Sequence, residues 1–239
     1  MTDGRERMIV ALDFPSYEKA REFIEKLGDH VWFYKVGLEL FLNSQGRIVA
    51  FLKEKKKRIF LDLKFHDIPN TTAQAAVFAA GQDVFMFNVH AGGGKKMMKA
   101  VAEEVKKINP RTLMMAVTIL TSISEQEAAE TFGSRWTIKE LAVNLARLAR
   151  EAGMDGVVCS PWEAKDVKAA IGNDFKTVCP GIRLRENSTD DQERIMTPYD
   201  AILNGCDYLV IGRPITKSPY PITSADAIAG EIEKALRKG

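Results

Sequence analysis

The stretch FLDLKFHDIPNTT, residues 60–72, begins as a hydrophobic run typical of a buried strand and then places charged side chains within that run. Asp62 and Lys64 are two positions apart, so on a β-strand they would point to the same side. Asp67 follows just beyond the run, before a turn stiffened by a proline. Because buried charges must be paired, this segment predicts either a structural ion-pair network or a site whose charges act on a substrate.

Two further charged residues hold comparable positions earlier in the chain. Asp13 closes the run MIVALDF, and Lys35 lies late in the run WFYKVG. An array of Asp and Lys at neighbouring strand ends carries a large desolvation cost, which favours a functional role over a purely structural one. Such an array keeps a lysine protonated beside fixed carboxylates, and it offers a substrate both a proton donor and a negative field.

The elements that must position these charges are eight short hydrophobic runs, nearly continuous, as expected of parallel strands covered on both faces. The runs span residues 8–14, 32–37, 58–65, 84–91, 113–120, 156–160, 176–182 and 208–213. Helical patterns lie between them, so the chain predicts a single-domain (β/α)8 barrel over residues 1–239, with a doubly wound open sheet as the alternative. In such a barrel the chemistry sits at the C-terminal ends of the strands.

Local signals mark where the helices begin and end. Amphipathic patterns over 16–28 and 137–153 predict helices, the second opening on a capping box. SPWEAKDVKAAIG, residues 160–172, predicts a helix entered directly from a strand, with Ser160 as N-cap, Pro161 at the first helical position and Glu163 as the capping glutamate. Three helices should end on a glycine that is followed by an acid before the next strand, in the phrases GQDVF (81–85), GMDGV (153–157) and GCDYL (205–209).

Composition excludes several classes of protein. With 34 Lys+Arg against 32 Asp+Glu and one short basic run at 53–58, which we interpret as a solvated helix end, the chain is not expected to bind nucleic acid. No run approaches the roughly 18 apolar residues of a membrane span, and the N-terminus leads straight into a strand, so we expect a cytoplasmic protein. The three cysteines are widely spaced in apolar runs, which predicts core thiols at Cys159, Cys179 and Cys206.

The segment DLKFHDIPNT resembles the D-x-K-x-x-D-I-P-x-T signature of the orotidine 5'-monophosphate decarboxylase family, and the likeness extends along the chain. The positions that match the family's site residues are Asp13, Lys35, Asp62, Lys64, Asp67, Ile68, Thr71, Thr121, Pro180, Arg183, Gln192, Gly212 and Arg213. The resemblance implies a (β/α)8 barrel that works without cofactor or metal as a homodimer with shared sites. It also implies conversion of orotidine monophosphate to uridine monophosphate and CO2, the last step of pyrimidine synthesis.

Roles follow from the same resemblance. Lys64 would be the proton donor, with Asp62, Lys35 and Asp67 completing the catalytic set and Asp67 reaching the partner's site. Gly212 and Arg213 after the last strand, with Arg183 after the seventh, suit a phosphate group, which barrels commonly bind with these two loops. The long polar loop 185–197 suits a lid in which Gln192 would reach phosphate and base.

Some interpretations stay open. Thr121 looks like a base contact, but a threonine there is equally typical of a strand-end cap. His66 and His90 are interpreted as structural or site-wall residues and not as general bases. A metal-dependent sugar-phosphate lyase of the same superfamily is disfavoured because those relatives carry a glutamate ligand where this chain has Lys35. A catalytically silent nucleotide-binding barrel is the remaining alternative.

Overall fold

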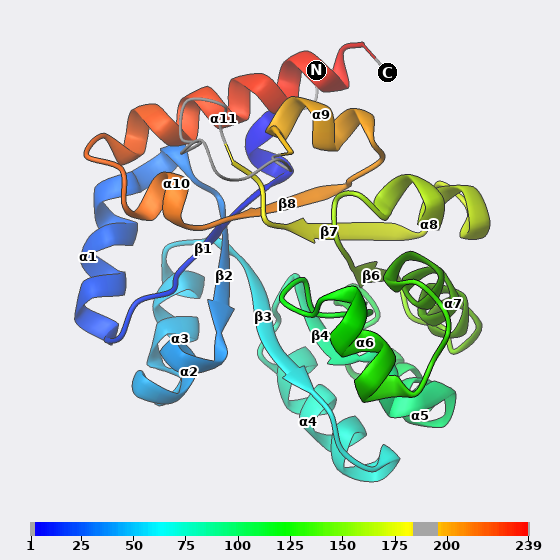
Figure 1. Cartoon of the computed structure of the whole chain (residues 1–239). Coiled ribbons are helices and arrows are strands. Elements are labelled where there is room, and N and C mark those ends of the chain that lie inside the picture. Colours follow the sequence, from blue (N-terminus) through cyan, green and yellow to red (C-terminus); the bar gives the residue numbers. More distant parts are fainter. Residues whose placement is uncertain (1–2, 184–195, 239) are drawn as a thin grey trace. The chain divides into compact units, whose positions relative to one another are not determined.

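The computed structural model describes residues 3–183 and 196–238, and its eight strands form a closed barrel in chain order (Figure 1). The predicted (β/α)8 barrel is confirmed in place of the open sheet. The strands are β1 Met8–Ala11, β2 Phe33–Gly37, β3 Arg58–Phe65, β4 Met86–His90, β5 Leu113–Val117, β6 Gly156–Val158, β7 Lys176–Pro180 and β8 Tyr208–Ile211.

Helices alternate with these strands. They are α1 Tyr17–Leu27, α2 Leu38–Asn43, α3 Arg47–Glu54, α4 Pro69–Gly81, α5 Gly94–Ile108, α6 Glu125–Phe132, α7 Ile138–Glu151, α8 Ala164–Ile171, α9 Pro198–Leu203, α10 Arg213–Thr216 and α11 Pro221–Leu236, with 3-10 turns η1 Gly4–Glu6, η2 Gly28–His30 and η3 Ala91–Gly93. The basic run at 53–58 is the mostly exposed end of α3 and its exit, as predicted. Within the part of the chain that the structure covers, no helix has the length and apolar character needed to cross a bilayer.

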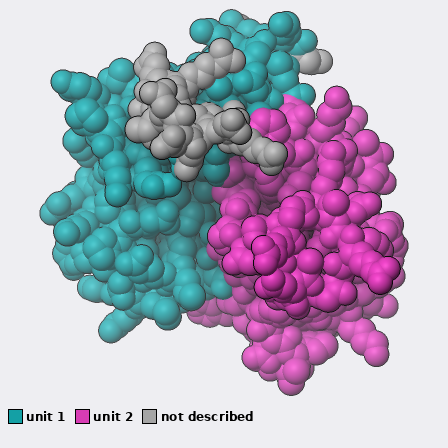
Figure 2. Space-filling model, viewed as in Figure 1, with its two compact units in different colours: residues 1–63, 181–203, 207–239 teal, residues 64–180, 204–206 magenta. Residues whose placement is uncertain are grey.

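The chain divides into two compact units, coloured separately in Figure 2. Unit 1 consists of residues 1–63, 181–203 and 207–239, and unit 2 of residues 64–180 and 204–206. A single domain over 1–239 stays a prediction.

The core of unit 1 is built on β1, whose four residues are all buried. Parallel pairing joins β1 to β2 at Val10 and Tyr34, and to β8 at Ile9 and Val210. Helices α9 and α11 pack against each other (Figure 1). In unit 2 the parallel strands β4, β5, β6 and β7 pair in sequence, and α4 packs along α5.

Several strands end earlier than the hydrophobic runs predict. Leu12, Ile119, Cys159 and Ile182 all leave the strand ladder and yet remain at most 6% exposed. Hydrophobic runs report burial, and burial continues past the last ladder hydrogen bond into the loops. Asp13 therefore lies in the loop after β1 and not at the end of the strand itself.

Helix capping follows the sequence at two predicted starts and departs from it at one. The Ser16 side chain caps α1, and Thr137 with Glu140 forms the complete capping box of α7. At 160–172 the Glu163 carboxylate does accept the Ser160 N–H, at 3.0 Å, but residues 161–163 form a turn and α8 begins only at Ala164. Placing Pro161 at the first helical position was therefore wrong.

The repeated glycine–acid phrase has two versions. Gly153 and Gly205 adopt left-handed φ angles of 87° and 92°, whereas in the first copy it is Asp83 that does so, with φ 53°. The acid of the second copy also has a structural task, because Asp155 Oδ2 accepts the Met114 N–H at 2.8 Å. This bond joins the entry of β6 to the entry of β5.

The three cysteines are buried and free, as predicted. The sulfur atoms of Cys159, just after β6, and Cys179 of β7 lie 4.0 Å apart. The hydrogen bond with Cys179 lowers the pKa of the Cys159 thiol, but burial and the nearby Glu163 outweigh it, so the pKa is raised. Burial raises the pKa of Cys179 as well, so both thiols stay protonated.

Candidate active site

Lys35 of β2 is the centre of the charged cluster in unit 1. Its Nζ lies 3.1 Å from Oδ1 of Asp13 and 3.3 Å from Oδ2 of Asp62. The Lys35 and Asp62 side chains are only 12% and 10% exposed, whereas that of Asp13 is 66% exposed. The structure thus brings together three residues predicted from three separate strands, with a buried ammonium between a buried and an open carboxylate.

The electrostatics of this cluster keep Lys35 charged. Burial acts to lower the pKa of its ammonium, but attraction and hydrogen bonds from Asp62 and Asp13 outweigh burial, and the net pKa is raised. Lys35 is therefore a fixed positive charge at neutral pH. The two carboxylates that surround it are held in place by the same contacts.

Two glycines border the cluster. A Cβ atom on Gly37 would lie 3.0 Å from Lys35 Nζ, and one on Gly212 would lie 3.6 Å from Asp13 Oδ2. Gly212, predicted as a binding residue, thus lies beside Asp13. Gly37 was not predicted as a site residue. The sequence pattern that could have indicated it is a glycine at the C-terminal end of β2, two residues after Lys35, where a side chain would crowd the lysine ammonium.

Lys64 lies at the start of unit 2, two residues after Asp62 on the same strand, β3. Its φ angle is 51°, in the left-handed region. Regular strand alternation, on which the prediction of a shared side rested, therefore does not set the direction of the Lys64 side chain. Its backbone N–H donates to Oδ1 of Asn88 at 2.8 Å.

The loop after β3 carries Asp67 on an exposed turn. The Asp67 N–H donates to Thr72 Oγ1 at 3.0 Å, and the Thr72 hydroxyl donates back to the Asp67 carbonyl at 3.0 Å. Asp67 Oδ1 also accepts the Ile68 N–H at 2.6 Å. Predicted site residues Ile68 and Thr71 are exposed here, while the unpredicted Thr72 is buried and fixes the turn.

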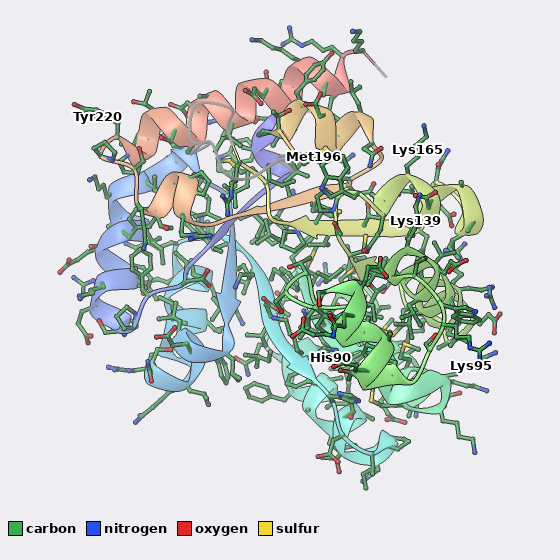
Figure 3. The ribbon with its side chains drawn as sticks, in the orientation of Figure 1. His90, Lys95, Lys139, Lys165, Met196 and Tyr220 are labelled. Atoms are coloured by element: carbon green, nitrogen blue, oxygen red, sulfur yellow. The ribbon has the colours of Figure 1, made fainter. Side chains whose placement is uncertain are left out.

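The other predicted residues lie after later strands. In unit 2, Thr121 is exposed in the turn after β5, and Pro180 is the last residue of β7. In unit 1, Arg213 is exposed directly after Gly212, and the Arg183 N–H donates to the carbonyl of Met196, labelled in Figure 3, at 3.2 Å. Gln192 and the predicted lid, apart from its last two residues, lie outside the described residues.

Two of the three histidines lie close together in unit 2. The rings of His66 and His90, the latter at the end of β4 (Figure 3), have centroids 5.2 Å apart. In unit 1, His30 Nδ1 lies 3.0 Å from Asp226 Oδ1. The structural or site-wall role of His66 and His90 stays a prediction.

A closed eight-stranded barrel in which a lysine of β2 lies between a carboxylate of β3 and one from the loop after β1 has the architecture of a (β/α)8-barrel enzyme. Residues 6–228 match the Orotidine 5'-phosphate decarboxylase / HUMPS family, and the chain belongs to that family. The resemblance seen in the signature segment is thereby confirmed.

Individual relatives agree along nearly the whole length. The chain is 47% identical over 231 residues to the orotidine 5'-phosphate decarboxylase of Chromobacterium violaceum, covering 97% of this chain and 93% of the relative. It is 45% identical over 237 residues to that of Syntrophomonas wolfei, covering 97% and 99%. The crystal structure of orotidine 5'-phosphate decarboxylase from Lactobacillus acidophilus superposes with a TM-score of 0.84 at 38% identity, covering 94% of this chain and 98% of that one.

Proposed function

We propose that this chain converts orotidine 5'-monophosphate to uridine 5'-monophosphate and CO2, in the cytoplasm, as the last step of pyrimidine nucleotide synthesis. The names of its relatives support the reaction. The observation that carries the proposal is the Lys35 ammonium held at 3.1 Å and 3.3 Å between Asp13 and Asp62. A fixed array of opposite charges suits a reaction whose transition state differs from its ground state mainly in where charge lies.

The proposed mechanism uses the charges directly. The bond between C6 of the pyrimidine and its carboxylate breaks, CO2 leaves, and the electron pair stays on C6. Asp62 lies against the departing carboxylate and raises the energy of the bound ground state. The Lys64 ammonium stabilises the developing carbanion and then transfers its proton to C6, which gives uridine monophosphate and a neutral lysine.

The binding residues in this proposal divide by the part of the nucleotide they contact. Gly212, Arg213 and Arg183 bind the phosphate, because backbone amides beside a glycine and a guanidinium fork suit its oxygens. Pro180, Thr121 and Gln192 contact the base end, with Gln192 also reaching the phosphate. Phosphate contacts far from C6 supply binding energy for the chemical step, so orotidine without phosphate should react with a much lower kcat/KM.

The proposal includes a homodimer with shared sites. Asp67, Ile68 and Thr71 would enter the partner's site, where Asp67 joins the partner's charge array. Their exposure supports this assignment, since Ile68 is 67% exposed on a turn that Thr72 holds in a fixed shape. An exposed isoleucine beside an exposed carboxylate suits an isologous interface more than a free surface.

A metal-dependent reaction on a sugar phosphate is the competing function. Lys35 argues against it, since an ammonium between Asp13 and Asp62 stands where a divalent cation would need oxygen ligands free of a competing positive charge. The experiment follows the loss of orotate absorbance when purified protein meets orotidine monophosphate, with and without EDTA, and assays 3-keto-gulonate phosphate in parallel.

Three outcomes are distinct. Turnover of orotidine monophosphate that survives EDTA, with none on the sugar phosphate, supports the proposal. EDTA-sensitive turnover of the sugar phosphate would establish the metal-dependent lyase instead. Binding of uridine monophosphate without any turnover would make the chain a silent nucleotide-binding barrel.

A further inference from the structure

A side chain of β4 supplies a hydrogen-bond acceptor to the end of β3. Asn88 Oδ1 accepts the Lys64 N–H at 2.8 Å, and Asn88 is 0% exposed. In a parallel ladder such an N–H ordinarily donates to a carbonyl of the neighbouring strand. Here an amide side chain takes that place at the residue that carries the proposed proton donor.

Lys64 has a backbone conformation that requires such support. Its φ of 51° is left-handed, which is unfavourable for a residue with a Cβ atom and persists only where the surroundings fix it. The same φ determines where the Cβ atom, and hence the long side chain, begins its path. Relaxation of Lys64 to an extended conformation would point its ammonium in a different direction.

Asn88 itself is rigidly held. It lies in the middle of β4, pairs with Met115 of β5, and has the fully buried Phe87 and Val89 as chain neighbours. A buried strand residue is a precise anchor, because its rotamer and backbone are set by packing on both faces. The lysine with the left-handed φ is thus tied to a fully buried residue in the middle of a strand.

We propose that Asn88 is a positioning residue for the decarboxylation, which acts by holding Lys64 in the left-handed conformation that aims its ammonium at the reacting carbon. This inference rests on the proposed function of Lys64. It adds Asn88 as a residue that acts through Lys64. Nothing in the signature segment indicates this role.

The test uses two variants of Asn88 and one matched control. Asn88→Leu keeps the branching and the number of side-chain heavy atoms but has no acceptor, and Asn88→Asp keeps the acceptor oxygen. Thr112→Val is the control, because Thr112 is also buried and donates to the Val84 carbonyl at 3.0 Å, before the opposite end of β4. Asn88→Leu removes the bond to the Lys64 N–H, and Thr112→Val removes the bond to the Val84 carbonyl.

Two readouts separate positioning from simple destabilisation. Asn88→Leu should lower kcat by about 100-fold, with KM within about threefold of wild type, and should speed hydrogen exchange at the Lys64 amide. Thr112→Val should lose comparable stability but keep wild-type kcat and wild-type exchange at Lys64. The kcat of Asn88→Asp should be at least about tenfold higher than that of Asn88→Leu.

Contrary results are equally concrete. A kcat for Asn88→Leu within about threefold of wild type, or an equal loss in Thr112→Val, would overturn the inference. If Asn88→Leu does not fold, Asn88→Ala is judged by the same criteria. Failure of the wild-type protein to decarboxylate the nucleotide would refute the proposed function instead, and exchange at Lys64 would still show whether Asn88 holds its backbone.

Discussion

Lys35 Nζ lies 3.3 Å from Asp62 Oδ2, and the two side chains are only 12% and 10% exposed. Burial of either charge alone would be unfavourable by several kcal/mol, whereas each compensates the other when they are buried together. The pair therefore explains how the Lys35 ammonium keeps a raised pKa although its side chain is buried. It also means that neither residue can be changed without disturbing the other.

Lys35→Met should abolish measurable decarboxylation and lower the free energy of unfolding by about 3 kcal/mol at pH 8. Stability falls because methionine has a side chain of similar size to lysine but leaves the Asp62 carboxylate buried beside an apolar group. Urea unfolding and the orotate absorbance assay measure the two effects.

The double variant Lys35→Met with Asp62→Asn is the control for this coupling. Removing both charges should recover a large part of the lost unfolding free energy, although not the activity. A double variant whose stability loss equals the sum of the two single losses would show that the pair contributes no coupling.

Lys64→Ala should lower kcat by at least about 100-fold, because it removes the proposed proton donor, and general acid catalysis alone contributes about 10²–10⁴-fold. The variant should still fold and bind uridine monophosphate, which calorimetry and circular dichroism can measure. Retention of more than about a tenth of the wild-type rate would contradict the role of Lys64 as proton donor.

Much of this architecture could be predicted from local sequence. Eight hydrophobic runs located the eight strands, and a threonine three residues before a glutamate located the start of α7. Both signals work because the interactions they report, burial on a sheet and capping within one turn, join residues close in sequence. The charged cluster was predictable for another reason, since a charge inside a hydrophobic run contradicts its surroundings.

What could not be predicted depends on contacts between strands. The buried amide of Asn88 gives no local sign that it supports Lys64, which is 24 residues earlier in the chain. The left-handed φ of Lys64 has no local sign either, because lysine has no preference for that region. The ends of strands could not be predicted either, because hydrophobic residues stay buried beyond the strand: Leu12, just after β1, is as buried as the residues of β1.

Glu163 provides a prediction about pH. Burial raises the pKa of its carboxyl to about 7; the Ser160 N–H bond opposes this rise, and nearby Asp166 and Glu125 add to it. An acid with a raised folded pKa stabilises the fold below its unfolded pKa, near 4.5, and that contribution is lost as pH rises to about 7. The loss is on the order of 3 kcal/mol.

Glu163→Gln removes this titration but keeps an oxygen that can accept the Ser160 N–H. Compared with wild type, the variant should therefore gain stability progressively between pH 4.5 and 7 and keep that gain at pH 8. Urea unfolding of both proteins at several pH values measures the difference. A difference that does not change over this range would show that Glu163 titrates normally.

Two glycine substitutions at the contact between η1 and α11 should have opposite effects. A Cβ atom on Gly4 would overlap the Ala229 carbonyl oxygen, so Gly4→Ala must displace backbone and should destabilise the protein by about 1–3 kcal/mol. Gly230, the next residue of α11, has open space where a Cβ atom would lie, and Gly230→Ala should stabilise the helix by about 0.5–1 kcal/mol. Thermal unfolding measures both, and equal effects of the two alanines would refute the close approach.

The last prediction concerns the proposed sharing of sites between two copies of the chain. Asp67 lies on an exposed turn three residues after Lys64, with Ile68 exposed beside it. If Asp67 serves the partner's site, Lys64→Ala and Asp67→Ala should each be inactive alone. Mixed under conditions that allow subunit exchange, they should form heterodimers in which one site carries both lesions and the other carries neither.

Simple counting gives the size of the effect. Random exchange of an equal mixture makes half of the dimers mixed, and each mixed dimer has one intact site, so roughly a quarter of all sites should be active. The control is a mixture of Lys64→Ala with Lys35→Met, whose lesions lie in the same proposed half of the site, so no intact site can form. If exchange is confirmed by mass spectrometry and the first mixture is as inactive as the control, Asp67 acts within its own chain and the shared site is wrong.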